Sequence, residues 1–228
     1  MNVTLLQYTK NPERAIALAA RLCYSDAGIE ELKGRISATQ TGKLVRMLVR
    51  MGHHSALEHA SFTFGVEGVS RSLTHQLVRH RLASYSQQSQ RYVKAEAFEY
   101  VIPPAIESNP RLKNIFNQTM SGIQKVYNLF TRQGIAAEDA RYVLPNATET
   151  KIIVTMNARE LLHFCLLRCC NRAHWEIHEL ADKMLKHAKT IALAAFETAG
   201  PACVAGNCRE GRMSCGKTTE VREKYRLL

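Results

Sequence analysis

A helix-rich α+β fold is predicted from two kinds of hydrophobic pattern in the 228 residues. Residues 61–68 alternate apolar side chains with small or polar ones, and residues 149–156 have the β-branched composition of a strand. By contrast, residues 109–132, 157–170 and 174–198 each have the pattern of a long helix. Helices therefore account for most of the expected regular structure.

The first predicted helix covers residues 43–51, where apolar side chains recur at helical spacing, and the strand 61–68 follows it. A helical pattern returns at Ser70, and we expect it to continue to His80. Beyond Ala83 the sequence SYSQQSQ contains poor helix formers whose side chains hydrogen-bond well in loops. The chain should therefore leave the helix there and form a loop.

An extended segment is expected over residues 92–104, which end in two prolines. The long helix 109–132 stops before Gly134, because glycine commonly follows a helix C-terminus. A short helix at 136–142 is stopped by Pro145.

The strand 149–156 leads into Asn157, a residue type favoured at helix N-caps. Glu160 lies three residues later, which is the spacing of a capping-box partner. The helix that starts at this point should run through Cys170. The last predicted helix, 174–198, is closed by the Gly-Pro pair at 200–201.

Composition predicts a single domain spanning residues 1–228, because 46% of the residues are apolar, 22% are charged and no repeat or linker divides the chain. No basic start followed by an apolar run opens the sequence, and no apolar stretch approaches the roughly 20 residues that span a bilayer. We therefore expect a soluble, cytoplasmic protein. The net charge of +11 suits a nucleic-acid binder, a membrane-surface protein or an enzyme for phosphorylated substrates.

The stretch RHRLASYSQQSQRY at 79–92 contains three arginines and a histidine but no carboxylate. If the preceding helix reaches His80, Gln76 and Arg79 lie one turn apart on one face. A loop rich in Ser and Gln between Arg79 and Arg91 can bind a phosphate through charge-assisted hydrogen bonds. The alternative is a solvated basic helix end, and spacing alone does not decide between the two.

The segment HHSALEH at 53–59 offers three imidazoles and Glu58, which suggests a metal site. It lacks the H-E-x-x-H order, in which two histidines share one helical face with a glutamate. Ser55 and Glu58 have capping-box spacing, so a helix cap or a ligand-contact loop is the favoured interpretation.

Arg168 lies in an apolar run that should fill the core, so its guanidinium must meet an anion or a polar partner. A structural salt bridge is the more general explanation. Arg159 and His163, four residues apart, share a face of the same predicted helix.

Seven cysteines, without a secretory signal, are expected to stay reduced. Cys203, Cys208 and Cys215 cluster in the C-terminal tail, 201–228. No pair has the two-residue spacing common in zinc sites. Free or redox-active thiols are therefore favoured over a metal site, and no metal is expected in the protein.

Several motifs together resemble one known family, the flavin-dependent thymidylate synthases (ThyX). RHRLASYSQQS has the R-H-R-x7-S signature, and GHHSALEHASFTF resembles the family segment that precedes it. ARYVLP at 140–145, NARELLHFCLLR at 157–168 and WEI at 175–177 also match, in the family's order. The resemblance covers most of residues 40–200.

The resemblance implies an α+β protomer with a mixed sheet, assembled as a homotetramer whose active sites are shared between chains. It implies FAD as cofactor, with dUMP, 5,10-methylenetetrahydrofolate and NADPH as ligands. The one-carbon unit of the folate passes to C5 of dUMP, and reduced flavin supplies the hydride that completes the methyl group of dTMP. All of these ligands are anionic, which suits the positive charge and the missing carboxylates.

The resemblance also implies site residues. Arg168 corresponds to the arginine that contacts uracil and favours its N3-ionised form, so it is the expected catalytic residue. Ser89 and Arg91 would hold the phosphate. The full set implied for dUMP is Gln76, Arg79, Gln87, Gln88, Ser89, Gln90, Arg91, Arg141 and Arg168.

The set implied for FAD is Ser55, Glu58, Arg79, His80, Arg81, Gln87, Asn157, Arg159 and His163. His53 corresponds to a histidine associated with folate or substrate access. Gln87, His163 and His174 depart from residues common in the family (Glu, Asn and Gln).

Two functions other than a thymidylate synthase fit parts of the sequence. A nucleic-acid binder could stack bases on Tyr85 and Tyr92 beside the arginines. A regulatory module could use the C-terminal cysteines. Neither explains the ordered set of motifs, so we expect an enzyme that binds no nucleic acid. Cys165, Cys169 and Cys170 lie beside Arg168, but the resemblance implies hydride transfer without an enzyme thiolate.

Overall fold

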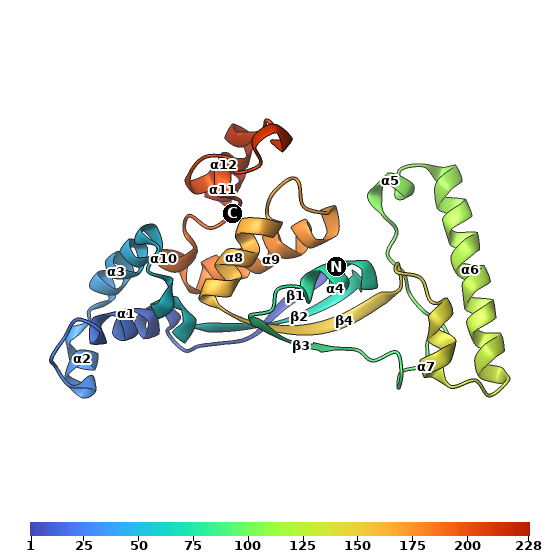
Figure 1. The fold of residues 1–228 in the computed structure, drawn as a ribbon, viewed down its shortest axis with the longest axis horizontal. Coiled ribbons are helices and arrows are strands. Elements are labelled where there is room, and N and C mark those ends of the chain that lie inside the picture. The colour runs from blue at the N-terminus through green and yellow to red at the C-terminus, as the bar shows by residue number, and fades with distance from the viewer. The chain divides into compact units, whose positions relative to one another are not determined.

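A computed structural model describes all 228 residues, and Figure 1 shows the ribbon. Four strands form one sheet in the order β1-β2-β4-β3. Their bounds are Asn2–Tyr8 for β1, Ser61–Ser70 for β2, Ala83–Gln87 for β3 and Glu149–Asn157 for β4. Twelve α-helices and three short 3-10 segments complete the α+β fold.

The sheet is antiparallel, so the expected mixed sheet is wrong. At one end of the β2–β4 pair the amide of Ala158 donates to the carbonyl of Ala60, and at the other end the amide of Arg71 donates to Thr148. Residue numbers rise along one strand as they fall along the other, which defines an antiparallel pair. None of the strand pairs is a parallel one that would need a crossover helix.

The chain packs into two compact units. The first unit comprises residues 1–2, 66–79 and 85–153, and the second comprises residues 3–65, 80–84 and 154–228. All four strands contribute residues to both units. The single-domain expectation stays a prediction.

The first unit contains α4 (Arg71–Leu77), α5 (Pro104–Glu107), α6 (Pro110–Arg132) and α7 (Ala137–Ala140). Residues of the 92–104 segment bind along α6: the Gln124 side chain accepts from the Phe98 amide at 2.7 Å and donates to the Ala95 carbonyl at 2.7 Å. Tyr127, fully buried on α6, accepts from the Ala95 amide at 3.1 Å. These bonds explain why the segment is ordered without being a strand.

The second unit contains the N-terminal helices α1 (Pro12–Leu22), α2 (Ile29–Arg35) and α3 (Ala38–Met51) and the helices that follow β4. The latter are α8 (Ala158–Arg168), α9 (Trp175–Ile191), α10 (Leu193–Phe196), α11 (Ala202–Ala205) and α12 (Thr218–Leu227). Its core includes the edge-on pair of Phe62 and Phe196, whose ring centroids lie 5.5 Å apart.

The strongest periodic patterns are confirmed. The strand 61–68 lies within β2, the strand 149–156 within β4, and the helix 109–132 is α6. Asn109 caps α6 by accepting from the amides of Arg111 and Leu112. The helix at 43–51 forms the second half of α3, and the short helix at 136–142 appears as α7 followed by one 3-10 turn.

Three boundaries are wrong. The helix expected to reach His80 ends at Leu77, and the expected loop after Ala83 is strand β3. The amide of Gln88, just past β3, donates to the Lys151 carbonyl, so pairing with β4 decides the structure of a segment with little strand propensity. The long helix at 174–198 breaks at Ala192, whose φ of −142° is not helical.

None of the helices combines the length and the apolar character that a membrane crossing requires.

Candidate functional site

Arg168 is the last residue of α8, and its side chain meets a buried histidine of the second unit. The Nε of Arg168 donates to Nε2 of His80 at 3.0 Å. Because arginine can only donate, Nε2 of His80 must be the unprotonated nitrogen. Nδ1 then carries the hydrogen and donates to Oε1 of Glu160 at 3.2 Å. A line of hydrogen bonds thus runs from Glu160 through His80 to Arg168.

The surroundings keep His80 neutral. Its side chain is 6% exposed, and the ring of Phe164 lies edge-on to it with centroids 4.9 Å apart. Burial lowers the pKa of His80 to about 4, and the charges of Arg168 and His163 act in the same direction. Burial also raises the pKa of Glu160. The Nε of Arg168 therefore meets a neutral imidazole as its polar partner. The expectation that the run around Arg168 fills the core is wrong in part, because Arg168 is half-buried and Leu167 is 45% exposed.

Glu160 does not have the capping role expected from its spacing. Asn157 is the N-cap of α8, with its side-chain oxygen 2.9 Å from the amide of Glu160. The carboxylate of Glu160, however, is bonded to His80 and does not return to the Asn157 amide. Half of the expected capping box is thus confirmed, and the other half is replaced by the contact with His80.

The 3-10 segment His54–His59 likewise lacks the expected cap, because no side-chain cap hydrogen bond is made at its N-terminus. Instead Oε1 of Glu58 accepts from Nη1 of Arg159 at 2.5 Å, so two residues implied for FAD lie together on the surface. His163 is exposed, and its ring centroid is 6.1 Å from that of His80. Ser55, His53 and Arg81 are exposed in the same unit.

Most positions implied for dUMP belong to the first unit. Gln87, at the end of β3, donates from Nε2 to the hydroxyl of Thr74 at 3.0 Å and to that of Thr150 at 3.3 Å. These bonds fix the side-chain amide of Gln87. Of the other positions, Arg79 and Gln88 are exposed, and Gln76 and Gln90 are half-buried.

Arg91 and Arg141 are brought together at α7. Nε of Arg91 donates to Oε2 of Glu138 at 2.7 Å, and Nε of Arg141 donates to the carbonyl of the same residue at 3.1 Å. The hydroxyl of Ser89 accepts from the Arg91 amide at 3.2 Å. The carboxylate missing from the local sequence is therefore supplied 47 residues away, in a contact that is exposed on both sides.

Arg71 was not among the predicted residues. Burial lowers its pKa, and the nearby charge of Arg141 lowers it further. Two half-buried guanidinium groups near each other favour an anion between or beside them. The only signal in the sequence was one more basic residue at the start of a helix, which is too common to select.

The structure gives little support to a metal site, to a module built on the cysteines or to base stacking on Tyr85. No group of three or more His, Cys, Asp or Glu side chains is arranged to hold a metal ion. All seven cysteines are unpaired by disulfides. A hydrogen bond with Cys165 and burial raise the pKa of Cys169, and burial raises that of Cys203, so both remain thiols. Of the two tyrosines that could stack on bases, Tyr85 donates its hydroxyl hydrogen to the Leu77 carbonyl at 2.8 Å.

Comparison with known proteins gives consistent matches over nearly the whole chain. Residues 4–192 match the model of the family described as "Thymidylate synthase complementing protein". A flavin-dependent thymidylate synthase of Geobacter sulfurreducens is 52% identical over 228 residues, covering 99% of this chain and 98% of the relative. Enzymes of the same name from Clostridium tetani and Pyrococcus furiosus are 52% and 42% identical to this chain, with 97% and 96% of their lengths covered.

Proposed function

The chain belongs to the flavin-dependent thymidylate synthase family, and we propose that the line Glu160–His80–Arg168 is the centre of its chemistry. The enzyme converts dUMP to dTMP with FAD as its cofactor. Its co-substrates are 5,10-methylenetetrahydrofolate and NADPH. The observation that supports the proposed centre is the neutral, buried His80. It accepts a hydrogen bond from Arg168 and donates one to Glu160.

Arg168 is the catalytic residue of this proposal. A guanidinium beside the uracil ring stabilises negative charge at N3, most strongly where water is excluded. His80 orients that guanidinium by accepting from Nε, and Glu160 in turn holds His80 in the tautomer that leaves Nε2 as an acceptor. Neither residue competes with uracil for the charge of Arg168 as a directly bonded carboxylate would.

The phosphate of dUMP binds, in this proposal, at Ser89, Arg91 and Arg141. Arg91 is paired with Glu138 at the surface, where ion pairs contribute only about 0–1 kcal/mol. A phosphate dianion held by two charge-assisted hydrogen bonds replaces such a partner readily. Gln76, Arg79, Gln87, Gln88 and Gln90 complete the proposed contacts to the nucleotide.

The donors of the second unit fit an FAD pyrophosphate, because the exposed Arg81, Arg159 and His163 supply cationic and hydrogen-bonding groups. We assign FAD binding to Ser55, Glu58, Arg79, His80, Arg81, Gln87, Asn157, Arg159 and His163. When bound and reduced, FAD supplies the hydride that completes the methyl group. Both ring nitrogens of His80 are engaged within the protein, so its contribution comes from its ring face or backbone. His53, exposed before the 3-10 segment, is assigned to folate or substrate access.

We also propose that the protein assembles as a homotetramer with shared active sites. One face of α6 supports self-association, because its five exposed large apolar residues fall within about 100° of one another around the helix axis. They are Leu112, Ile115, Val126, Leu129 and Phe130. Such a face is costly to leave in water.

The test uses the absorbance spectrum of protein that has been mixed with FAD in the dark and desalted, recorded with and without dUMP. A retained flavin band that shifts on addition of dUMP would support neighbouring sites for both ligands. Replacing Arg168→Ala should lower dTMP formation by about 10²–10³-fold while flavin stays bound. Arg132→Ala, at the exposed end of α6 and outside both proposed sets, is the control. Full activity of Arg168→Ala would contradict the assignment.

A further inference from the structure

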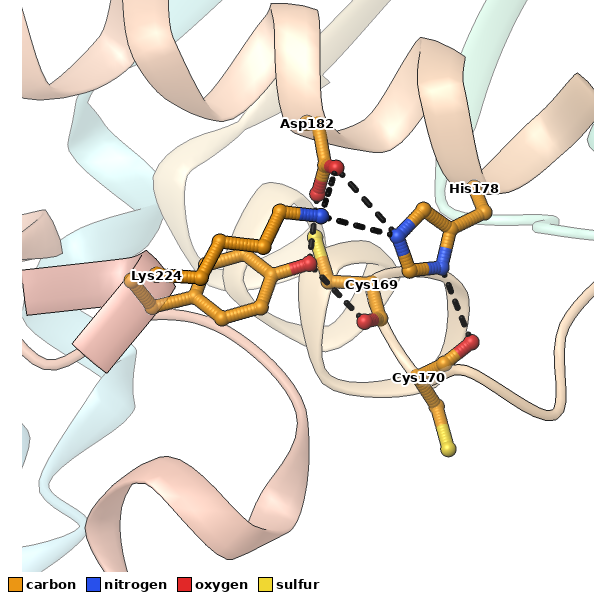
Figure 2. A network of polar contacts seen from close by, with 6 residues as sticks. Cys169, Cys170, His178, Asp182 and Lys224 are labelled. Carbon is orange, nitrogen blue, oxygen red and sulfur yellow. Dashed lines mark hydrogen bonds and ion pairs between the residues drawn. The ribbon is translucent and has the colours of Figure 1, made fainter. Parts of the chain in front are cut away.

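The C-terminal helix α12 brings two side chains, Lys224 and Tyr225, to the end of α8. Figure 2 shows Lys224 pointing to Asp182 of α9 and to His178 beside it, with Nζ of Lys224 3.1 Å from Nε2 of His178. Nζ of Lys224 lies 2.5 Å from Oδ2 of Asp182, and Nε2 of His178 lies 3.3 Å from the same oxygen. All of these residues belong to the second unit.

Tyr225 connects this network to the residue that follows Arg168. Its side chain is 1% exposed, and its hydroxyl lies 2.9 Å from the carbonyl of Cys169 and 2.5 Å from Oδ1 of Asp182. Burial is the largest of the effects that raise the pKa of Tyr225 far above its ordinary value, so the hydroxyl keeps its hydrogen. Cys169 is the C-cap of α8.

Carbonyl groups at a helix C-terminus have no donor within the helix and must find one elsewhere. The hydroxyl of Tyr225 lies at the Cys169 carbonyl, and Nδ1 of His178 lies 3.0 Å from the carbonyl of Cys170. Because a carbonyl only accepts, Nδ1 of His178 carries the hydrogen. The carbonyl of Cys169 thus meets a side chain of α12, and that of Cys170 meets His178 of α9, as Figure 2 shows, in addition to the Ala173 amide at 2.8 Å.

Asp182 is the ionised centre of the network. Burial alone raises its pKa, but hydrogen bonds from His178, Lys224 and Tyr225 outweigh burial and lower the pKa to about 2. The Tyr225 hydroxyl has one hydrogen, which is shared between Oδ1 of the ionised Asp182 and the Cys169 carbonyl, so both acceptors hold the phenol oxygen at the end of α8. Nζ of Lys189 also lies 2.5 Å from the carbonyl of Tyr225, which holds the backbone of α12 at this point.

We infer that Tyr225 and Asp182 are positioning residues for Arg168: they hold the C-terminal end of α8 from the backbone side while His80 holds the guanidinium. Arg168 is then fixed at both ends, since its Nε bonds to His80 and the next peptide carbonyl bonds to Tyr225. This role of the C-terminal helix rests on the proposed catalytic role of Arg168. The C-terminal tail then supports the reaction through Tyr225 of α12 and not through its cysteines.

The test compares Tyr225→Phe, which removes only the hydroxyl, with a control on the same helix. Arg222→Gln removes hydrogen bonds from α12 to the carbonyls of Cys203 and Gly206, at 2.8 and 2.9 Å, and leaves the end of α8 untouched. Both variants remove hydrogen bonds made by α12, but only Tyr225→Phe releases the carbonyl of Cys169, the residue after Arg168. Rates are expressed per bound flavin, so that a smaller folded fraction does not imitate a catalytic effect.

We expect Tyr225→Phe to raise KM for dUMP and lower kcat/KM for dUMP by about five- to tenfold, the effect of about one misplaced hydrogen bond. The flavin content and KM for methylenetetrahydrofolate should stay within about twofold. Arg222→Gln should leave KM for dUMP unchanged. A tail with a purely structural role would change the yield or the thermal midpoint of both variants without a selective change in KM for dUMP.

Equal dUMP kinetics in Tyr225→Phe and Arg222→Gln would overturn the inference. If Tyr225→Phe does not fold, Asp182→Asn replaces it, because this variant removes the charge and keeps the shape. We expect Asp182→Asn to raise KM for dUMP by a smaller factor. Arg168→Lys is measured in parallel. If that variant retains full activity, the proposed role of Arg168 is at fault; if it loses activity while the tail variants do not, only the positioning role is wrong.

Discussion

The imidazole of His80 shows how one residue can connect catalysis to stability. It accepts from Arg168 only while Nε2 is unprotonated, and its burial against Phe164 opposes the charged form. A protonated His80 would place a second positive charge against Arg168. Acid should therefore weaken both the fold and the orientation of the guanidinium, through one group.

This predicts a specific pH dependence of stability. The folded pKa of His80, about 4, lies below its ordinary value of 6.5, so between these values the unfolded chain binds more protons. The stabilisation is complete above about pH 6.5 and is lost as the pH falls towards 4. From about pH 7.5 to about pH 5 the loss from this residue is on the order of 2 kcal/mol. Glu160, whose pKa is raised, contributes with the opposite sign.

Urea unfolding of the wild type and of His80→Asn at both pH values measures this loss. The variant should be less stable at neutral pH, but it should lose less free energy of unfolding on acidification. Parallel losses in the two proteins would show that His80 is not the group responsible. Asp182 and His178 titrate in both proteins, so their contributions cancel in the comparison.

At the scale of the elements, what could be predicted depends on how local the cause is. Helix α6 and strands β2 and β4 follow from periodicity within ten or twenty residues, and the cap Asn157 lies where the sequence places it. Strand β3 was missed because it depends on pairing with β4, more than sixty residues away.

The candidate site divides in the same way. The arginines and glutamines of 76–91 were identified from composition and resemblance, but their partners were not. The contact of Glu160 with His80 spans 80 residues, and that of Arg91 with Glu138 spans 47. A capping spacing at Glu160 even favoured a different partner. Pairwise contacts at such distances depend on how the elements pack, which local pattern does not contain.

Asn157 offers a test in which capping and cofactor binding can be separated. Its side-chain oxygen caps α8, so Asn157→Ala should lower the free energy of unfolding by about 1 kcal/mol. Asn157→Asp keeps a capping oxygen and should retain most of that stability. If the amide nitrogen contributes to FAD binding as proposed, Asn157→Asp should still weaken FAD, measured by titration of the flavin fluorescence. Wild-type FAD affinity in a stable Asn157→Asp would remove this residue from the FAD set.

At the scale of the whole molecule, the +11 charge has a simple explanation in the ligands. Nucleotide, folate and dinucleotides are all anions, and a basic protein concentrates them near its surface. The charge alone could not distinguish this enzyme from a nucleic-acid binder, and the ordered motifs had to do so. Assembly is the property that no local pattern could establish, and the exposed apolar face of α6 is the structural argument for it.

If the apolar face of α6 lies in the subunit contact, a charge placed on it should disturb assembly. Leu129 is the most exposed of the five apolar residues, at 54%, so Leu129→Glu should place a charge in the proposed subunit contact and reduce the mass measured by light scattering. Ser121→Glu adds the same charge to an exposed position on another side of α6, and should leave the mass unchanged. Because the proposed active sites are shared between chains, activity should fall together with the mass for Leu129→Glu. A tetramer that persists in this variant, or a wild type that is monomeric, would remove α6 from the subunit contact and leave its apolar face without a role in assembly.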